Sequence, residues 1–236
     1  MKQRALWGIL GFCLAGCRGN LATFQPARTM PTGGFAVGAE GSGVGAISDE
    51  GDKVEGTFSI TGRYAVTDRI EIGARVGATR PEIMAKFGLV NGESTRTSIS
   101  LAPSVGAFVA TATGIVAANT YGQLPVLVGV PLGRHELVLA GAVHFGHAIN
   151  VDTYVWGLAV GPGASVGFVA NPTAWLSIVP TLAVALPFFR AGSSGVDTGD
   201  TVTYQLGVAI LAGKISPAYR REAHPRSSET SRRALH

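Results

Sequence analysis

Apolar and polar residues alternate along most of this chain. Over residues 57–66 the even positions are mostly apolar and the odd positions are mostly polar, from Thr57 and Phe58 to Val66. Successive side chains of a β-strand point to opposite faces, so this pattern predicts a strand with one apolar and one polar face.

The next stretch repeats the alternation after a two-residue turn at Thr67-Asp68. Over residues 69–77 the apolar side chains Ile70, Ile72 and Val76 share one parity, and the charged side chains share the other. A helix would distribute these charges around its circumference. Two alternating stretches joined by two residues predict a β-hairpin.

The same pattern predicts ten strands in all: residues 33–46, 54–66, 69–79, 82–90, 95–109, 117–131, 136–146, 152–169, 174–189 and 201–212. Short, turn-like connections such as 133–135 alternate with longer or more irregular ones such as 47–53 and 190–200. Short turns on one side and longer loops on the other are typical of outer-membrane barrels.

The body of the chain therefore resembles the family of small bacterial outer-membrane β-barrels. The resemblance implies an all-β fold over residues 33–214: an antiparallel transmembrane β-barrel of about ten strands (roughly 8–12) in meander order. An even strand number places both chain ends on the short-turn side, which is the periplasmic side in this family.

Three features depart from this pattern. First, five prolines lie inside predicted strands, and each requires a bulge or a strand end. They are Pro103, Pro125, Pro162, Pro180 and Pro187. The last predicted strand is followed by an arginine-rich tail, whereas such barrels usually end on an aromatic residue. Residues 153–189 carry no charge, which leaves open two transmembrane helices packed through small-residue motifs.

The start of the chain carries a separate signal. Lys2 and Arg4 precede an apolar run, residues 5–14, which ends in Leu14-Ala15-Gly16-Cys17. This order is that of a secretory signal peptide, and the apolar run is too short to span a bilayer. One interpretation is an ordinary cleaved signal with an accidental cysteine.

A more specific interpretation is that the four residues ending at Cys17 resemble the lipobox of bacterial lipoproteins. The resemblance implies that residues 1–16 are removed as a lipoprotein signal peptide and that Cys17 becomes an acylated, palmitate-type N-terminus. Arg18 stands where this family's inner-membrane retention signal has aspartate, which implies delivery to the outer membrane. Residues 17–32 are then expected to form a tether, and residues 215–236 a basic disordered tail.

Composition agrees with a body that contacts lipid. Charged residues make up 14% of the chain, and there are 33 glycines. The net charge of +4 arises at the ends, because residues 17–216 hold twelve basic and thirteen acidic side chains. The body thus offers no basic face for nucleic acid.

The candidate site is a network of charges at lumen-facing parity. Its members are Arg63, Glu71, Arg75, Lys86, Glu136 and His144. Charges inside a narrow barrel can pair with one another, or they can select a small solute. No catalytic residue, metal ligand or cofactor is expected. His144 and His147 could not share a metal, because they would point to opposite faces of a strand. The motif Gly163-Ala-Ser165-Val-Gly167 lacks the helix that a nucleophile elbow requires.

These observations predict a lipid-anchored outer-membrane barrel that is a structural or scaffold subunit of a cell-envelope assembly for secretion, adhesion or motility. The expected partners are membrane lipids and envelope proteins, which would bind the periplasmic N-terminus or the basic tail. Three alternatives remain: a narrow channel with a charged lumen, a lipid-modifying enzyme, and a tethered soluble lipocalin-like barrel.

Overall fold

The computed structural model describes residues 21–47, 53–77, 81–91, 97–112, 115–151, 154–186, 189–193, 195–197 and 202–214. Within these ranges all helix or strand assignments are β-strand. The predicted signal peptide, Cys17 and the predicted tail lie outside the described residues.

The strands are β1 (Phe35–Ile47), β2 (Lys53–Thr67), β3 (Ile70–Gly77), β4 (Pro81–Val90), β5 (Ser98–Leu101), β6 (Ser104–Ala112), β7 (Ile115–Leu132), β8 (His135–Asn150), β9 (Trp156–Thr173), β10 (Leu176–Ala185), β11 (Phe189–Gly192), β12 (Gly195–Asp197) and β13 (Val202–Gly213).

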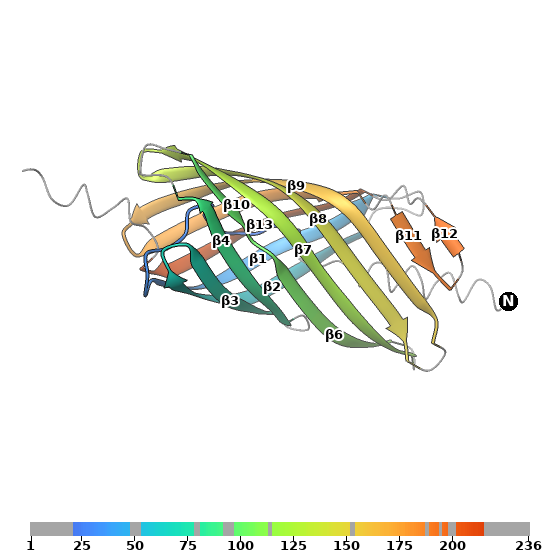
Figure 1. Cartoon of the computed structure of the whole chain (residues 1–236). Coiled ribbons are helices and arrows are strands. Elements are labelled where there is room, and N and C mark those ends of the chain that lie inside the picture. The colour runs from blue at the N-terminus through green and yellow to red at the C-terminus, as the bar shows by residue number, and fades with distance from the viewer. Residues whose placement is uncertain are drawn as a thin grey trace, which may run out of the picture.

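The strands form a closed antiparallel barrel, which confirms the predicted fold class (Figure 1). Closure joins the first strand to the last: β1 pairs with β13 from Ala36 opposite Gly213 to Ile47 opposite Val202. β5 and β6 follow each other along the same neighbours, β4 and β7, so they act as one broken strand. β11 continues the line of β10 along β9 and forms a hairpin with β12. The wall therefore has ten strands.

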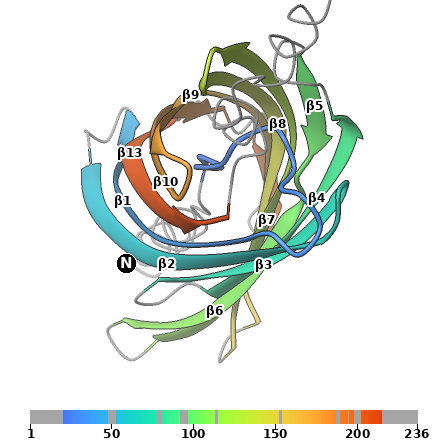
Figure 2. The same ribbon diagram turned by 90° about the vertical axis from the view of Figure 1, so that its left-hand side faces the viewer.

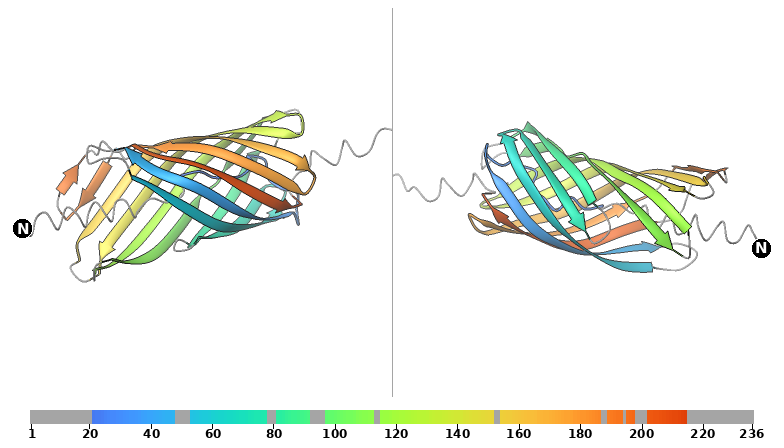
Figure 3. Two further views of the ribbon diagram at one scale, coloured as in Figure 1. Left: turned by 180° about the vertical axis from the view of Figure 1, so that it is seen from behind. Right: turned by 90° about the horizontal axis from the view of Figure 1, so that it is seen from below.

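One end of the barrel carries tight turns. The β2–β3 hairpin turns at Asp68 and Arg69, the β7–β8 hairpin at residues 133–134, and the β9–β10 hairpin at residues 174–175. The chain also enters and leaves the wall here, because a Cβ on Gly34 would lie 3.0 Å from the carbonyl oxygen of Lys214. We call this the short-turn end. The wall is uneven in height, since β7 and β9 have 18 residues and β3 has eight (Figure 3).

The prolines lie where the neighbouring strand ladder is interrupted. Pro103 separates β5 from β6, and Pro125 of β7 faces that same break. Pro162 of β9 lies between the part paired with β10 and the part paired with β11. Pro180 of β10 lies in a gap of the β9–β10 ladder. Proline has no N–H to donate, so these breaks are the places in a strand ladder that accommodate it. Pro187 lies outside the described residues.

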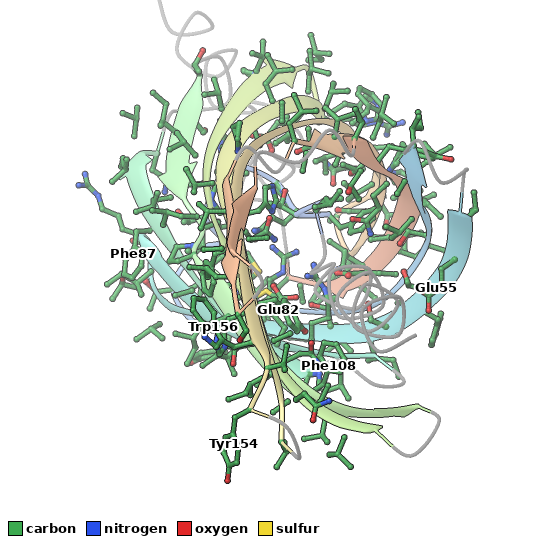
Figure 4. The ribbon with its side chains drawn as sticks, turned by 90° about the vertical axis from the view of Figure 1, so that its right-hand side faces the viewer. Glu55, Glu82, Phe87, Phe108, Tyr154 and Trp156 are labelled. Atoms are coloured by element: carbon green, nitrogen blue, oxygen red, sulfur yellow. The ribbon has the colours of Figure 1, made fainter. Side chains whose placement is uncertain are left out.

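The barrel has an apolar outside and a polar inside. Exposed large apolar side chains occur along β1–β4, β6–β10 and β13, while most buried charged and amide side chains belong to the opposite parity. Phe87 and Tyr154 point away from the barrel in Figure 4, and Glu82 lies within it. This arrangement is that of a barrel embedded in hydrocarbon, and it is the inverse of a soluble calyx.

The helical alternative for residues 153–189 is wrong where the structure describes them. β9 and β10 occupy most of this stretch. Among the described residues no helix meets the length and apolarity needed to cross a bilayer.

The lipid-facing role of the outer surface can be tested at Leu206, which is near the middle of β13 and 63% exposed. Leu206→Arg should lower the free energy of unfolding in lipid vesicles by about 2–4 kcal/mol, because it places a charge in hydrocarbon. Leu206→Ala is the matched control and should cost much less. In a water-soluble barrel both substitutions would change urea unfolding within roughly 0.5 kcal/mol.

Candidate functional site

The lumen contains part of the chain's own N-terminal segment. Residues 21–32 have no regular structure, yet all except Arg28, Pro31 and Thr32 are buried. Their contacts are with lumen-facing side chains, and the segment runs inside the ring of strands in Figure 2. We call residues 21–32 the plug. The sequence predicts a tether over residues 17–32, and the described part of that tether is buried in the barrel.

Charged side chains of β3 and β4 bind the backbone of the plug. The N–H of Met30 donates to Glu71 Oε1 at 2.6 Å. Lys86 Nζ donates to the carbonyl oxygens of Pro26 and Arg28, at 3.3 and 3.0 Å. An irregular segment cannot satisfy its own N–H and C=O groups, so these contacts replace the ladder that it lacks.

The two ends of the plug are held at different depths. At the short-turn end, Thr32 donates its N–H and hydroxyl to Asp68 Oδ1, both at 2.7 Å. These hydrogen bonds hold the pKa of the Asp68 carboxyl below its ordinary value, so the contact weakens only as the pH falls through that lowered pKa. Deep in the lumen, the N–H groups of Leu21 and Ala22 both donate to Gln205 Oε1, at 2.7 and 2.9 Å.

The opposite wall receives the apolar side chains of the plug. Leu21, Phe24 and Met30 belong to one buried cluster with small or branched side chains of the wall. In β8–β10 and β13 that cluster includes Val138, Ala140, Val169, Val179, Ala183, Ala185, Ala209 and Leu211. The absence of charge over residues 153–189 therefore has a packing reason: the lumen face of β9 and β10 lies against apolar plug.

Three glycines of the wall lie where plug side chains approach closely. A Cβ on Gly207 would lie 2.8 Å from Phe24 Cζ but closer to Ser42, and one on Gly129 would lie 2.8 Å from Ala27 Cβ but closer to Glu136. A Cβ on Gly88 would lie 3.1 Å from Thr29 Oγ1. These approaches show that the wall and the plug are fitted to each other at several heights.

Six charged side chains of the lumen form two ion-paired groups of three. Arg75 bridges two carboxylates, with Nε 2.6 Å from Glu40 and Nη1 2.9 Å from Glu82. Glu71 pairs with Lys86 at 2.8 Å and more loosely with Arg63 at 3.7 Å. We call these six residues the charged cluster: Glu40, Arg63, Glu71, Arg75, Glu82 and Lys86. All are buried, and three of each sign compensate one another.

The structure thus brings together four of the predicted site residues, Arg63, Glu71, Arg75 and Lys86. Arg63 also reaches the plug, because Nη1 donates to Gln25 Oε1 at 2.9 Å. Glu136 lies beside the plug instead, against Ala27 over Gly129. His144 lies apart: its imidazole packs over Gly163, and among the described residues no hydrogen bond or ion pair joins it to the charged cluster.

Sequence reasoning missed Glu40, Glu82 and Gln205. Glu82 shares the parity of Lys86 in the predicted strand 82–90, and Glu40 lies within the predicted strand 33–46, so the alternation contained their signal. Gln205 carries no charge and follows Tyr204 in an apolar strand, and only its contact with the plug shows its role.

Two chemical motifs considered from the sequence, a nucleophile elbow at Ser165 and a metal-ligand group, are not found in the described part of the chain. Ser165 lies inside β9, which pairs with β8 and β10 on either side of it, so the turn and helix of a nucleophile elbow are absent there. The described residues include no group of three metal-ligating side chains.

The polarity and closure of the barrel decide the fold class. This chain folds as a transmembrane-type β-barrel. Among solved structures it is similar to Neisserial surface protein A, with 12% identity over 75% of this chain and 96% of that one, at a TM-score of 0.44. It is also similar to OprG from Pseudomonas aeruginosa (9% identity, 78% and 97% coverage, TM-score 0.38). A third is Ail of Yersinia pestis (9% identity, 76% and 99% coverage, TM-score 0.35). All three show likeness of fold alone.

No protein-family model and no curated protein sequence matches this chain. The candidate site is therefore defined by the residues of this chain alone.

The charged cluster should be energetically coupled. Glu71→Gln leaves Lys86 and Arg63 without their shared counter-charge and should cost about 3–5 kcal/mol of unfolding free energy. Adding Lys86→Gln restores the charge balance and should recover part of that loss, measured by urea unfolding in vesicles. Glu55→Gln, on an exposed part of β2, is the control. Additive losses in the double variant would contradict a coupled cluster.

The docking of the plug can be followed by cleavage at Arg28. Gly88→Leu should displace the plug, because even its Cβ would lie 3.1 Å from Thr29 Oγ1, while the nearest wall atom, Arg69 Cα, would be 3.6 Å away. Trypsin should then cut after Arg28 in the purified, folded barrel, and should not cut the unaltered protein there. Gly141→Leu is the matched control, since a Cβ on Gly141 meets nothing within 4 Å. Equal cleavage in both variants would show that the plug does not need this fit.

Proposed function

We propose that this protein is a lipid-anchored bacterial outer-membrane barrel that acts as a structural subunit of a cell-envelope assembly, in secretion, adhesion or motility, and not as an open pore. The observation that carries the proposal is the plug. It lies along the lumen from Thr32 to Leu21 and is bound by Asp68, Glu71, Lys86, Arg63 and Gln205.

The lumen charges support this role because they already bind one another and the plug. The six residues of the charged cluster compensate one another, and Arg63, Glu71 and Lys86 also bind the plug. A selectivity filter instead presents charges to a passing ion. The ion pairs here favour a lumen that is held shut.

The lipid supports a role beyond retention. A closed barrel with an apolar outer surface holds itself in the membrane, so an acyl chain on Cys17 would add little to its retention. The acyl chain would instead serve to sort the protein, to orient it or to dock its N-terminal region. The outer membrane is the compartment that fits both an apolar-surfaced β-barrel and a lipobox-type signal.

A second candidate is a channel that opens when the plug leaves. The buried polar atoms Ser100 Oγ, Ser104 Oγ and Gln123 Oε1 have no hydrogen-bond partner among the described residues. Ser104 and Gln123 lie opposite each other on β6 and β7. Unpaired polar atoms of this kind are satisfied by water, which favours a hydrated region beside the plug.

Planar-bilayer recording separates the two candidates. The complete mature barrel should show no conductance, because the plug occupies the lumen. Deletion of residues 21–31 should produce stepwise conductance, and Gly88→Leu should produce it part of the time. Gly141→Leu should stay silent.

The same recordings can contradict the structural role. Spontaneous opening of the unaltered protein, in a voltage range where Gly141→Leu also opens, would favour the channel. A silent deletion variant that still shows heat-modifiable migration on gels would show that the plug is not what closes the lumen.

A further inference from the structure

The plug enters at the short-turn end and reaches deep into the lumen at Leu21. Thr32 is bound to Asp68 in a turn at the short-turn end. Met30 and Arg28 are bound farther in, at Glu71 and Lys86, and Leu21 is bound at Gln205. Residues 27–32 contact the wall near the short-turn end, with Thr29 at the Asp68 carbonyl and Ala27 beside Glu136. Residues 21–24 reach deeper, to Gly207 and Gln205.

The depth of Leu21 follows from its partner. Gln205 is eight residues before Gly213, where β13 ends at the short-turn end, and three residues after Val202, where β13 begins. With a rise of about 3.3 Å per residue and a strand tilt of about 40°, Gln205 lies about 20 Å from the short-turn end and about 8 Å from the other end.

This depth limits where the preceding residues can go. A chain of four residues spans at most about 14 Å when it is fully extended. Position 17 therefore cannot reach back to the short-turn end while Leu21 is bound to Gln205. It can reach the opposite end.

We infer that residues 21–32 thread the barrel from the short-turn end, so that the chain before Leu21 leaves at the opposite end, which faces outward from the cell. Where Cys17 is acylated, which rests on the proposed function, its lipid inserts in the outer leaflet. The plug is then fastened at both ends, by the wall at Phe35 and by the lipid at Cys17.

The hydrogen bonds of the plug favour the threaded path over the alternative in which the lipid, in the leaflet at the short-turn end, pulls the plug out of the lumen. Withdrawal toward the short-turn end would break the hydrogen bonds to Gln205, Lys86, Glu71 and Arg63 together. It would also expose the apolar cluster around Phe24 to water in the lumen.

Thiol labelling in intact cells tests the path of the chain. In Gly19→Cys the new thiol lies between Cys17 and the bound Leu21. A membrane-impermeant maleimide should label it in intact cells. Val151→Cys, beyond β8 at the outward end, should label in the same way. Arg134→Cys, in the β7–β8 turn at the short-turn end, should label only after the outer membrane is permeabilised.

Two results overturn the inference. Gly19→Cys that labels only after permeabilisation, together with Arg134→Cys, would show that the chain leaves at the short-turn end. The same conclusion would hold if locking the plug abolished labelling in intact cells. The lock is a disulfide in Thr29→Cys/Gly88→Cys/Gly19→Cys, and its spacing is suitable because a Cβ on Gly88 would lie 3.1 Å from Thr29 Oγ1. The threading model expects the locked protein to label as before.

Metabolic labelling with an alkyne fatty acid separates this inference from the proposed function. Surface labelling of Gly19→Cys with an acyl label that is lost in Cys17→Ala supports both. Surface labelling without any acyl label supports the threaded path and rejects the lipid anchor. An acyl label on protein whose Gly19→Cys thiol is periplasmic rejects threading and leaves the anchor.

Discussion

Hydrocarbon offers no hydrogen-bond partner, and this constraint determines the rest of the structure. Every backbone N–H and C=O of the wall must pair with a neighbouring strand, so the sheet has to close on itself, and it does so through β1 and β13. The same constraint sends charged side chains to the inside. The charged cluster is the result, and its balance of three positive and three negative groups makes its burial tolerable.

The plug resolves a second problem that closure creates. The inward side chains of a ten-stranded barrel leave part of the lumen unfilled. Here one side of the lumen is polar and the opposite side is lined by small apolar residues. An irregular segment with polar backbone and apolar side chains matches both walls at once. Its N–H and C=O groups meet Glu71 and Lys86, while Phe24 and Ala27 lie against glycines and small side chains.

Much of the wall could be predicted from the sequence, because a strand that faces lipid on one side and polar groups on the other leaves a period of two. The β2–β3 hairpin turns at Asp68 and Arg69, one residue after the predicted Thr67-Asp68. The predicted strand 95–109 was wrong in one respect: the ladder is broken at Pro103. The alternation placed Arg63, Glu71, Arg75 and Lys86 at the lumen-facing parity of their own strands, and it could have placed Glu40 and Glu82 there also.

The plug could not be predicted in the same way. Residues 21–32 have no period, and their composition is that of an ordinary linker. Their partners are far away along the chain: Leu21 and Gln205 are 184 residues apart. Nothing local distinguishes a linker from a segment whose hydrogen bonds are supplied by another part of the molecule.

The contact between Leu21 and Gln205 also constrains the order of folding. Gln205 belongs to β13, the strand that seals the barrel against β1. The first described residue of the chain thus acquires its contact only when the last strand of the barrel is in place. Assembly has to keep the N-terminal segment within a curling, still open sheet until that final seam forms, so the wall matures around its occupant.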